Sequence, residues 1–155
     1  MALSKNCQKV QDYLNRFNLK LEVQELSKST RTAQQAADAV GCAVGQIVKS
    51  LIFRTGDRPL LFLVSGKNQL DVNKVNAVFN FQLHKADAHF VREKTGYAIG
   101  GVPPVAHAFP MEVFIDRDLM EYDQIWAAAG TPNAVFYLKS NDLPRITGGR
   151  VIDMK

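Results

Sequence analysis

Apolar residues in the first forty positions recur at helical, then strand-like, then again helical spacing. From residue 7 to residue 17, an apolar side chain returns every three or four positions, which predicts a helix that Ser4 can cap. Residues 19–23 alternate apolar and polar side chains and are therefore expected to form a half-buried strand. Residues 33–40 predict a second helix, which Thr32 can cap.

The middle of the chain predicts a β-hairpin followed by two short helices. Residues 47–53 and 59–64 are mostly apolar, and they flank the segment RTGDR, whose Gly and Asp favour a tight turn. One helix is expected to start at Asp71. Another is expected to cover residues 87–94, with Gly96 just past its end.

The last third of the chain begins with GYAIGGVPPVAHAFP, residues 96–110, which is too rich in Gly and Pro for regular structure. Strands and helical segments then alternate without a strict βαβ order. The expected fold class is therefore α+β (mixed α/β), with a curved, barrel-like mixed β-sheet surrounded by helices. The predicted elements here are strands at 111–115, 124–129 and 134–138, a helical turn between the first two, a short helix in SNDLPRITGG and a final strand in RVIDM.

Length and composition indicate one soluble globular domain covering residues 1–155, with 46% hydrophobic and 22% charged residues. No apolar run is long enough for a membrane span or a signal peptide. The two cysteines, Cys7 and Cys42, are expected to be reduced thiols in a cytoplasmic protein. A net charge of +4 permits a polyanionic partner, but the basic residues are scattered and do not argue for one.

The common catalytic signatures are missing from this sequence. His84, His89 and His107 do not pair at helix-face spacing and there is no Cys-x-x-Cys, so neither a metal nor a cofactor is expected. The segment GYAIGG resembles a dinucleotide fingerprint only loosely, because it comes after a predicted helix rather than a strand. Asp116 and Asp118 are better explained as a turn cap than as a catalytic pair.

One candidate functional residue is Lys49, in the middle of the predicted strand GQIVKSLIF. An ammonium group is seldom buried without a partner. Strand alternation places Lys49 on the same face as Leu51 and Phe53. Spacing alone leaves two interpretations open. The lysine either lies along apolar surface with its head in water, or faces an anion in a functional site.

The second candidate is the segment GGVPP, Gly100 to Pro104. Two glycines let the backbone approach a ligand or adopt positive φ, and two prolines stiffen the end of the segment. Such a loop can bind a substrate through its backbone, although its composition also suits an ordinary crossover. The segment GTP at residues 130–132 is in the first place a turn.

Four segments together resemble the YbaK/EbsC family, free-standing relatives of the editing domain inserted in bacterial prolyl-tRNA synthetases. They are VGCAVGQIVKSLIF, LFLVSGKNQLDVNKV, TGYAIGGVPP and IWAAAGTPNAVF, in the family's order, and the similarity extends from about residue 32 to about residue 153. The resemblance implies a metal-independent aminoacyl-tRNA deacylase. Such an enzyme hydrolyses the ester of a mischarged small amino acid, typically on proline tRNA, and prolyl-tRNA synthetase is a further expected partner.

The resemblance also implies residue roles. Lys49 corresponds to the family's lysine that meets the phosphate of the tRNA 3′ end, and the loop with Gly100 and Gly101 would hold the ribose and the ester. Several relatives have a histidine where this chain has Asn133, which can form hydrogen bonds but cannot shuttle a proton. The remaining residues expected to contact substrate are Val102, Pro103, Ser50, Phe53, Ser65, Gly66, Gly130 and Thr131.

Other functions remain open at this point: a module that binds aminoacyl-tRNA ends or nucleotide-like ligands without turnover, or a pseudo-enzyme that acts as a protein-interaction partner. The sequence does not say which amino acid is removed, which tRNA is chosen, or what the oligomeric state is. Cysteine, alanine, serine and 2-aminobutyrate all suit a small pocket, because one methylene is worth only about 1–3 kcal/mol of discrimination.

Overall fold

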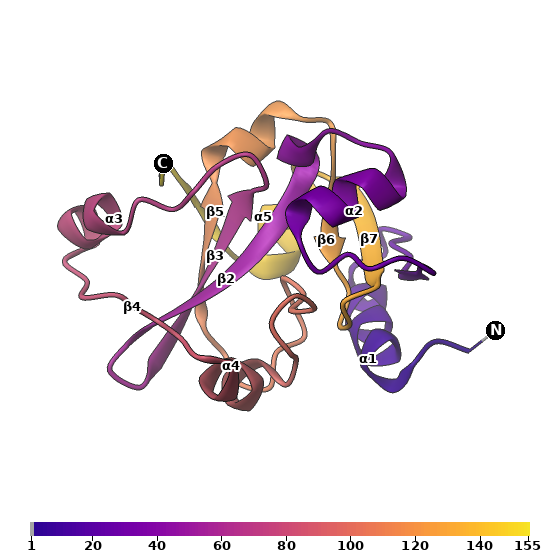
Figure 1. Ribbon diagram of the computed structural model, residues 1–155, viewed down its shortest axis with the longest axis horizontal. Coiled ribbons are helices and arrows are strands. Elements are labelled where there is room, and N and C mark those ends of the chain that lie inside the picture. Colours follow the sequence, from indigo (N-terminus) through magenta and orange to yellow (C-terminus); the bar gives the residue numbers. More distant parts are fainter. Residues whose placement is uncertain (1) are drawn as a thin grey trace.

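The predicted mixed α/β architecture is confirmed by a computed structural model that describes residues 2–155 (Figure 1). Within these residues, five α-helices accompany eight strands of one mixed sheet. The helices are α1 Lys5–Leu14, α2 Ala33–Val40, α3 Val72–Phe79, α4 Ala88–Thr95 and α5 Asp142–Thr147. The strands are β1 Gln24–Glu25, β2 Ile47–Thr55, β3 Arg58–Ser65, β4 His84–Lys85, β5 Glu112–Asp116, β6 Gln124–Ala128, β7 Ala134–Lys139 and β8 Arg150–Ile152. Short 3₁₀ turns are η1 Asn15–Phe17, η2 Val44–Gln46 and η3 Arg117–Glu121.

The sheet has the strand order β1-β7-β6-β2-β3-β5-β8, and β4 adds to β2 beside this path. The hairpin predicted around RTGDR is confirmed, with β2 and β3 antiparallel and in register from Val48 opposite Ser65 to Thr55 opposite Arg58. Its two-residue turn places Gly56 at positive φ, 60°, as a type II′ turn requires of its first central residue. Three neighbouring pairs, β2–β6, β3–β5 and β5–β8, are parallel, which makes the sheet mixed.

Strand β3 explains how the sheet divides the core. Its run of apolar residues is buried on both faces, as is typical of a central strand. Because side chains alternate along a strand, Leu61 and Leu63 pack into the cluster that includes α1, and Leu60 and Phe62 pack into the cluster that includes α3. In Figure 1, α1 and α3 accordingly lie toward opposite ends of the molecule.

Three helix starts have side-chain caps, at Thr32, Asp71 and Asp87. The expected cap at Ser4 is wrong in one respect: Ser4 occupies the N-cap position of α1, but its side chain makes no cap hydrogen bond. The Thr32 side chain accepts a hydrogen bond from the Gln35 backbone N–H, and the Gln35 side chain accepts one from Thr32 N–H, forming a capping box for α2. Asp71 and Asp87 cap α3 and α4 through their carboxylates, which accept from backbone N–H groups of the first helical turn. None of the helices within residues 2–155 combines the length and the apolar character needed to cross a membrane.

The prediction of a strand at residues 19–23 is wrong, because only the two residues of β1, further along, pair with β7. Lys20 has positive φ, 57°, which interrupts an extended strand. The apolar alternation still reports burial, since Val23 belongs to the main core. The Gln11 side chain replaces a neighbouring strand here: its Oε1 accepts from Val23 N–H at 2.8 Å and its Nε2 donates to the Leu21 carbonyl at 2.8 Å.

Replacing Gln11 with Ala is expected to lower the free energy of unfolding by about 1–3 kcal/mol, because two partly buried backbone groups lose their partners. Urea denaturation measures the change. The matched control is Gln8→Ala on the same helix, whose side chain bonds only the exposed Asp12 carboxylate and whose loss should cost far less. Equal stability of the two variants would show that Gln11 does not hold this segment.

Candidate functional site

A cleft of about 290 Å³ lies where β2 and β6 part. These strands pair in parallel only at Ile47–Trp126 and Val48–Ala127, and β4 joins the same edge of β2 only from Phe53. The intervening part of β2 has no ladder partner on this edge among residues 2–155. The cleft is lined by residues 30–33 and Ala36 around the start of α2, by residues 47–51 of β2, by Ile99, Gly100 and Val102, by residues 126–128 of β6, and by Val135.

The cleft brings together the two features singled out in the sequence, Lys49 and the glycine–proline loop. Lys49 lies in its β2 wall, and Gly100 and Val102 lie in the wall formed by the loop. Ser50, also predicted to contact substrate, is part of the same lining. Residues about fifty positions apart in sequence therefore face one space, as a binding site requires.

The Lys49 ammonium is half-buried and donates a hydrogen bond to the backbone carbonyl of Asn68. Desolvation lowers the pKa of Lys49 from the ordinary lysine value, while the nearby charge of Asp116 acts in the opposite direction. A lysine ammonium has three N–H donors. After the bond to Asn68, two donors remain that an anion in the cleft can accept from.

Backbone and side-chain groups of Ser50 add further polar character to the cleft. The Ile52 carbonyl accepts a bond from Ala86 N–H across the open edge, so by strand alternation the Ser50 N–H points to that edge too. The Ser50 hydroxyl and the Thr30 hydroxyl are buried and have no hydrogen-bond partner among the described residues. Buried polar groups are nearly always paired, so two unpaired hydroxyls on residues that line one cleft are unusual.

Gly100 and Gly101 have different surroundings. Gly100 has φ 92°, which favours glycine, and the Arg31 side chain lies so close that a Cβ there would be 2.7 Å from Arg31 Cγ. Gly101 is turned away from the cleft: its N–H donates to Ala98 O and its carbonyl accepts from Gly130 N–H, both at 3.0 Å. Gly101 thus lets the loop pack on the neighbouring turn, and Gly100 is the glycine that faces the cleft.

The residues of the GTPN turn hold this packing together. A Cβ at Gly101 would be 2.8 Å from the Thr131 carbonyl carbon, and Gly130 has φ 108°. The Thr131 hydroxyl donates to the Asn133 side-chain oxygen at 2.8 Å, and the Asn133 amide donates to the Leu26 carbonyl at 2.9 Å. Gly130, Thr131 and Asn133 lie outside the cleft lining, and the Asn133 side chain connects the turn to the segment before α2.

Four other predicted contact residues also lie outside the cleft. The Ser65 hydroxyl is buried and donates to Gly45 O at 2.7 Å, and a Cβ at Gly66 would lie 2.2 Å from Val44 O. Pro103 is buried, with its carbonyl 2.7 Å from His107 Nε2. Phe53 instead lines an adjacent apolar pocket of about 300 Å³, which shares Ser50, Leu51, Ile99 and Val102 with the cleft.

Sequence reasoning missed Thr30, Arg31, Ile99 and Trp126 as cleft residues. Thr30 and Arg31 immediately precede the cap Thr32, so the sequence shows that they lie near a helix start. It does not show which strands this helix start faces. Ile99 is 54% exposed although it is apolar, and it precedes Gly100. An exposed apolar residue beside a glycine pair is the signal that was available for it.

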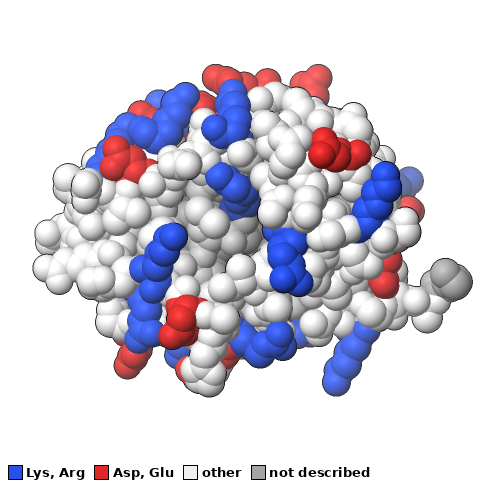
Figure 2. Space-filling model, in the orientation of Figure 1, with Lys and Arg blue, Asp and Glu red and all other residues white. Residues whose placement is uncertain are grey.

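The surface around the cleft is weakly basic. Figure 2 shows Lys and Arg side chains on several sides of a hollow in this face. Most Asp and Glu side chains lie toward the outline of the molecule. The lining itself contributes Arg31 and Lys49 and, within residues 2–155, no Asp, Glu, His or Cys. The described part of the chain also contains no group of three or more such residues that could hold a metal ion. The cleft is therefore suited to an anionic ligand with a small apolar portion.

Comparisons with known proteins agree with this chemistry. The model of the aminoacyl-tRNA editing domain matches residues 27–146. The YwhH protein of Bacillus subtilis (strain 168) is 31% identical over 143 residues, which cover 92% of this chain and 91% of YwhH. The proline–tRNA ligase of Thermosipho africanus (strain TCF52B) is 30% identical over 114 residues, covering 73% of this chain but only 20% of the ligase. A crystal structure described as a candidate trans-editing enzyme for prolyl tRNA synthetase superimposes with a TM-score of 0.93, at 48% identity and 99% coverage of both chains.

Replacing Thr30 with Val is expected to leave the free energy of unfolding unchanged or to raise it by up to about 1 kcal/mol, because the lost hydroxyl has no partner among the described residues. Chemical denaturation of the ligand-free protein measures this. The same change at Thr95 is the control: its buried hydroxyl donates to Val91 O at 2.7 Å and accepts from Tyr97 N–H at 3.0 Å. Thr95→Val should cost about 1–3 kcal/mol. A comparable loss in Thr30→Val would mean that the Thr30 hydroxyl is already paired.

Proposed function

The chain belongs to the aminoacyl-tRNA editing domain family, and on that premise we propose that it is a trans-editing deacylase formed by a single editing domain, residues 1–155. It hydrolyses the ester that joins a mischarged small amino acid to tRNA. Proline tRNA is the proposed substrate, because the matched relatives include proline–tRNA ligases. A prolyl-tRNA synthetase is the proposed partner that supplies tRNA selectivity.

The observation that carries this proposal is the meeting of three features in one cleft: Lys49, the loop residues Gly100 and Val102, and the open edge of β2 at Ser50. An aminoacyl-tRNA end presents a phosphodiester, a ribose and an acyl ester close together. Lys49 binds the phosphate as a compact cationic anchor. The loop places the ribose and the ester, and the Ser50 N–H is the donor proposed for the oxyanion.

Hydrolysis requires little from the side chains of the protein. Water attacks the ester carbonyl and gives up a proton, and the carbonyl oxygen becomes an oxyanion. The carbonyl then re-forms, the bond to the ribose oxygen breaks, and that oxygen takes up a proton, which leaves the free amino acid and the ribose hydroxyl. The ester is already activated by the neighbouring ribose hydroxyl and the α-ammonium group. Orientation and a fixed oxyanion donor then supply the acceleration, and the substrate supplies the acid–base groups, since the lining within residues 2–155 has no Asp, Glu, His or Cys.

The dimensions of the cleft support a small amino acid. Its volume of about 290 Å³ is at the lower end of the range of about 300–1,000 Å³ found for ligand sites. Part of the lining is apolar and short, from Ala33 and Ala36 of α2 and Ala127 and Ala128 of β6. A large side chain would have to displace these elements, and α2 is packed against β2 and β6 through Ala36, Ile47 and Trp126.

The lining within residues 2–155 contains no Asp, Glu, His or Cys, which favours a second candidate, a module that binds the aminoacyl-tRNA end without turnover. The two functions differ in one outcome. Incubation with proline tRNA charged with alanine, cysteine, serine, 2-aminobutyrate or proline gives faster ester loss for at least one small amino acid if the protein is a deacylase. Protection of the ester, or binding with an unchanged rate of loss, identifies the binding module.

Replacing Lys49 with Ala is expected to reduce deacylation at least about 100-fold, because the phosphate loses its anchor and the ester is no longer placed at the donor. Initial rates with the best substrate of the panel measure the loss. The fold should be retained, since the change removes a half-buried charge rather than core volume, and circular dichroism checks this. Lys139→Ala, an exposed lysine on β7, is the control for a loss of one positive charge. A Lys49→Ala variant as active as that control would refute the assignment of Lys49.

A further inference from the structure

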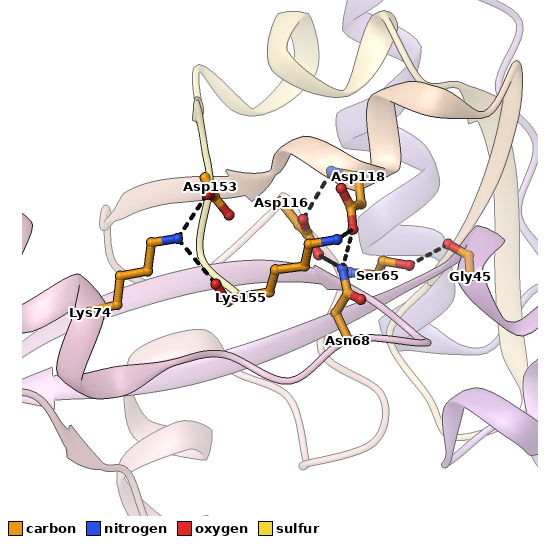
Figure 3. A network of polar contacts seen from close by, with 8 residues as sticks. All are labelled: Gly45, Ser65, Asn68, Lys74, Asp116, Asp118, Asp153 and Lys155. Atoms are coloured by element: carbon orange, nitrogen blue, oxygen red, sulfur yellow. Dashed lines mark hydrogen bonds and ion pairs between the residues drawn. The ribbon is translucent and has the colours of Figure 1, made fainter.

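We propose that Asn68 and Asp116 are positioning residues for Lys49. Asp116 holds the Asn68 side chain (Figure 3), and the Asn68 backbone carbonyl accepts a hydrogen bond from the Lys49 ammonium. Neither residue lines the cleft. The consequence for catalysis rests on the proposed function, whereas the geometry itself can be tested in the protein alone.

Asn68 lies in the turn between β3 and α3, and its side chain fixes that turn. Its Nδ2 donates to Asp116 Oδ2 at 2.9 Å and to Asp118 Oδ2 at 2.8 Å, so both of its hydrogens are used. Its backbone N–H donates to Ser65 O at 2.9 Å. With side chain and N–H both bound, the direction of its carbonyl is defined, and this carbonyl is the acceptor for Lys49 Nζ.

Asp116 is the fixed point of the network, at the end of β5. It is only 1% exposed, and its two oxygens accept from Ser65 N–H at 3.0 Å, from Asn68 Nδ2, and from Asp118 N–H at 3.0 Å. All three are uncharged donors. The sequence suggested a turn cap for this residue, and Asp116 does cap η3, but its second oxygen faces the β3–α3 turn.

The charges near Lys49 are not equivalent. Asp118 is ion-paired with Lys155 at 2.7 Å, so its charge is largely compensated, and the bond to Lys155 is the main reason that its pKa is lowered. Lys67 also acts on Asp118. Asp116 has only uncharged hydrogen-bond partners among the described residues. Its charge acts on two ammonium groups, those of Lys155 and Lys49. This attraction offsets part of the desolvation that disfavours a charged lysine beside an apolar cleft.

If the network only capped η3 and held the turn, substitutions in it would leave the pKa and the mobility of the Lys49 ammonium unchanged. The decisive measurement is therefore an NMR titration of Lys49 in the ligand-free protein, with lysine labelled at the side-chain ¹³Cε and ¹⁵Nζ. The Lys49 signal is assigned by its loss in Lys49→Ala. No substrate is needed, so the result stands whether or not the protein proves to be a deacylase.

Asp116→Asn is expected to lower the Lys49 pKa further, because the desolvation remains and the compensating charge is gone. The control is Asp153→Asn, which removes a carboxylate paired with Lys74 and should leave the Lys49 titration unchanged. Both of these carboxylates are drawn in Figure 3. An unchanged Lys49 pKa in a folded Asp116→Asn variant would overturn the electrostatic part of the proposal.

Asn68→Ala tests whether Asn68 positions the Lys49 ammonium. It also keeps the proposal testable if Asp116→Asn does not fold. The change keeps the carbonyl but removes the two bonds that fix it. The slowly exchanging Lys49 ammonium signal expected in the wild-type protein should broaden or disappear. Deacylation should lose about tenfold in kcat/KM, mainly through a higher KM, as expected when a phosphate anchor is less well ordered.

Asn76→Ala is the matched control for Asn68→Ala, because the Asn76 side chain also fixes a turn, through a 3.1 Å bond from Leu83 N–H, but has no bond to Lys49 or its partners. It should leave the ammonium signal and KM unchanged. A sharp wild-type-like Lys49 signal in Asn68→Ala, or equal effects of both asparagine variants, would overturn the positioning role. Loss of the signal together with no deacylation by the wild-type protein would refute the proposed function and keep the positioning role.

Discussion

The separation of β2 from β6 after two residue pairs is the feature on which the site depends. A sheet normally uses the backbone groups of a central strand on both edges, and β3 does so between β2 and β5. Strand β2 keeps its full ladder with β3 but leaves the opposite edge open around Ser50 until β4 joins at Phe53. The hairpin holds the open edge rigid from one side, and the Gly100 loop and the start of α2 form the other walls. A backbone donor is thereby presented to a cleft while β2 itself stays a regular strand.

The second constraint is the cost of keeping a charge beside an apolar cleft. A lysine there is useful only if it stays protonated and in place, and desolvation and side-chain entropy oppose these two conditions. Among residues 2–155, Lys49 has no direct ion pair that would occupy the donors needed for the proposed phosphate. The Asn68 carbonyl accepts one N–H of the ammonium. The buried carboxylate of Asp116, which binds the Asn68 side chain, attracts the ammonium, and the charge of the nearby Asp118 is compensated by Lys155. Lys49 is thus held by groups that do not compete with an anion for its two remaining donors.

Much of this architecture could be predicted from local sequence signals. Caps at Thr32, Asp71 and Asp87, together with the glycine turn of the hairpin, are encoded within a few residues of the element that they define. The apolar pattern at residues 19–23 predicted correctly that the segment is partly buried, but it predicted a strand that does not form. The backbone of this segment bonds the side chain of Gln11 instead of a neighbouring strand. Lys49 and Gly100 were recognisable as a charge in an apolar strand and a glycine before prolines. Thr30, Arg31 and Asn68 were not, because their importance comes from contacts across the fold.

Some residues of the recognised motifs face the cleft, and others only hold the surrounding backbone in place. Gly101, Gly130, Thr131 and Asn133 belong to motifs as distinctive as that of Lys49, yet they bond one another and pack the loop against the turn. Asn133 uses its amide on the Leu26 carbonyl and its side-chain oxygen on Thr131, so a histidine at this position in relatives would have to make different contacts. With no Asp, Glu, His or Cys among the cleft residues within 2–155, the proposed deacylation depends on where the ester is held. A small change in the packing of that turn would then alter catalysis through the position of Gly100, without removing any group that touches the substrate.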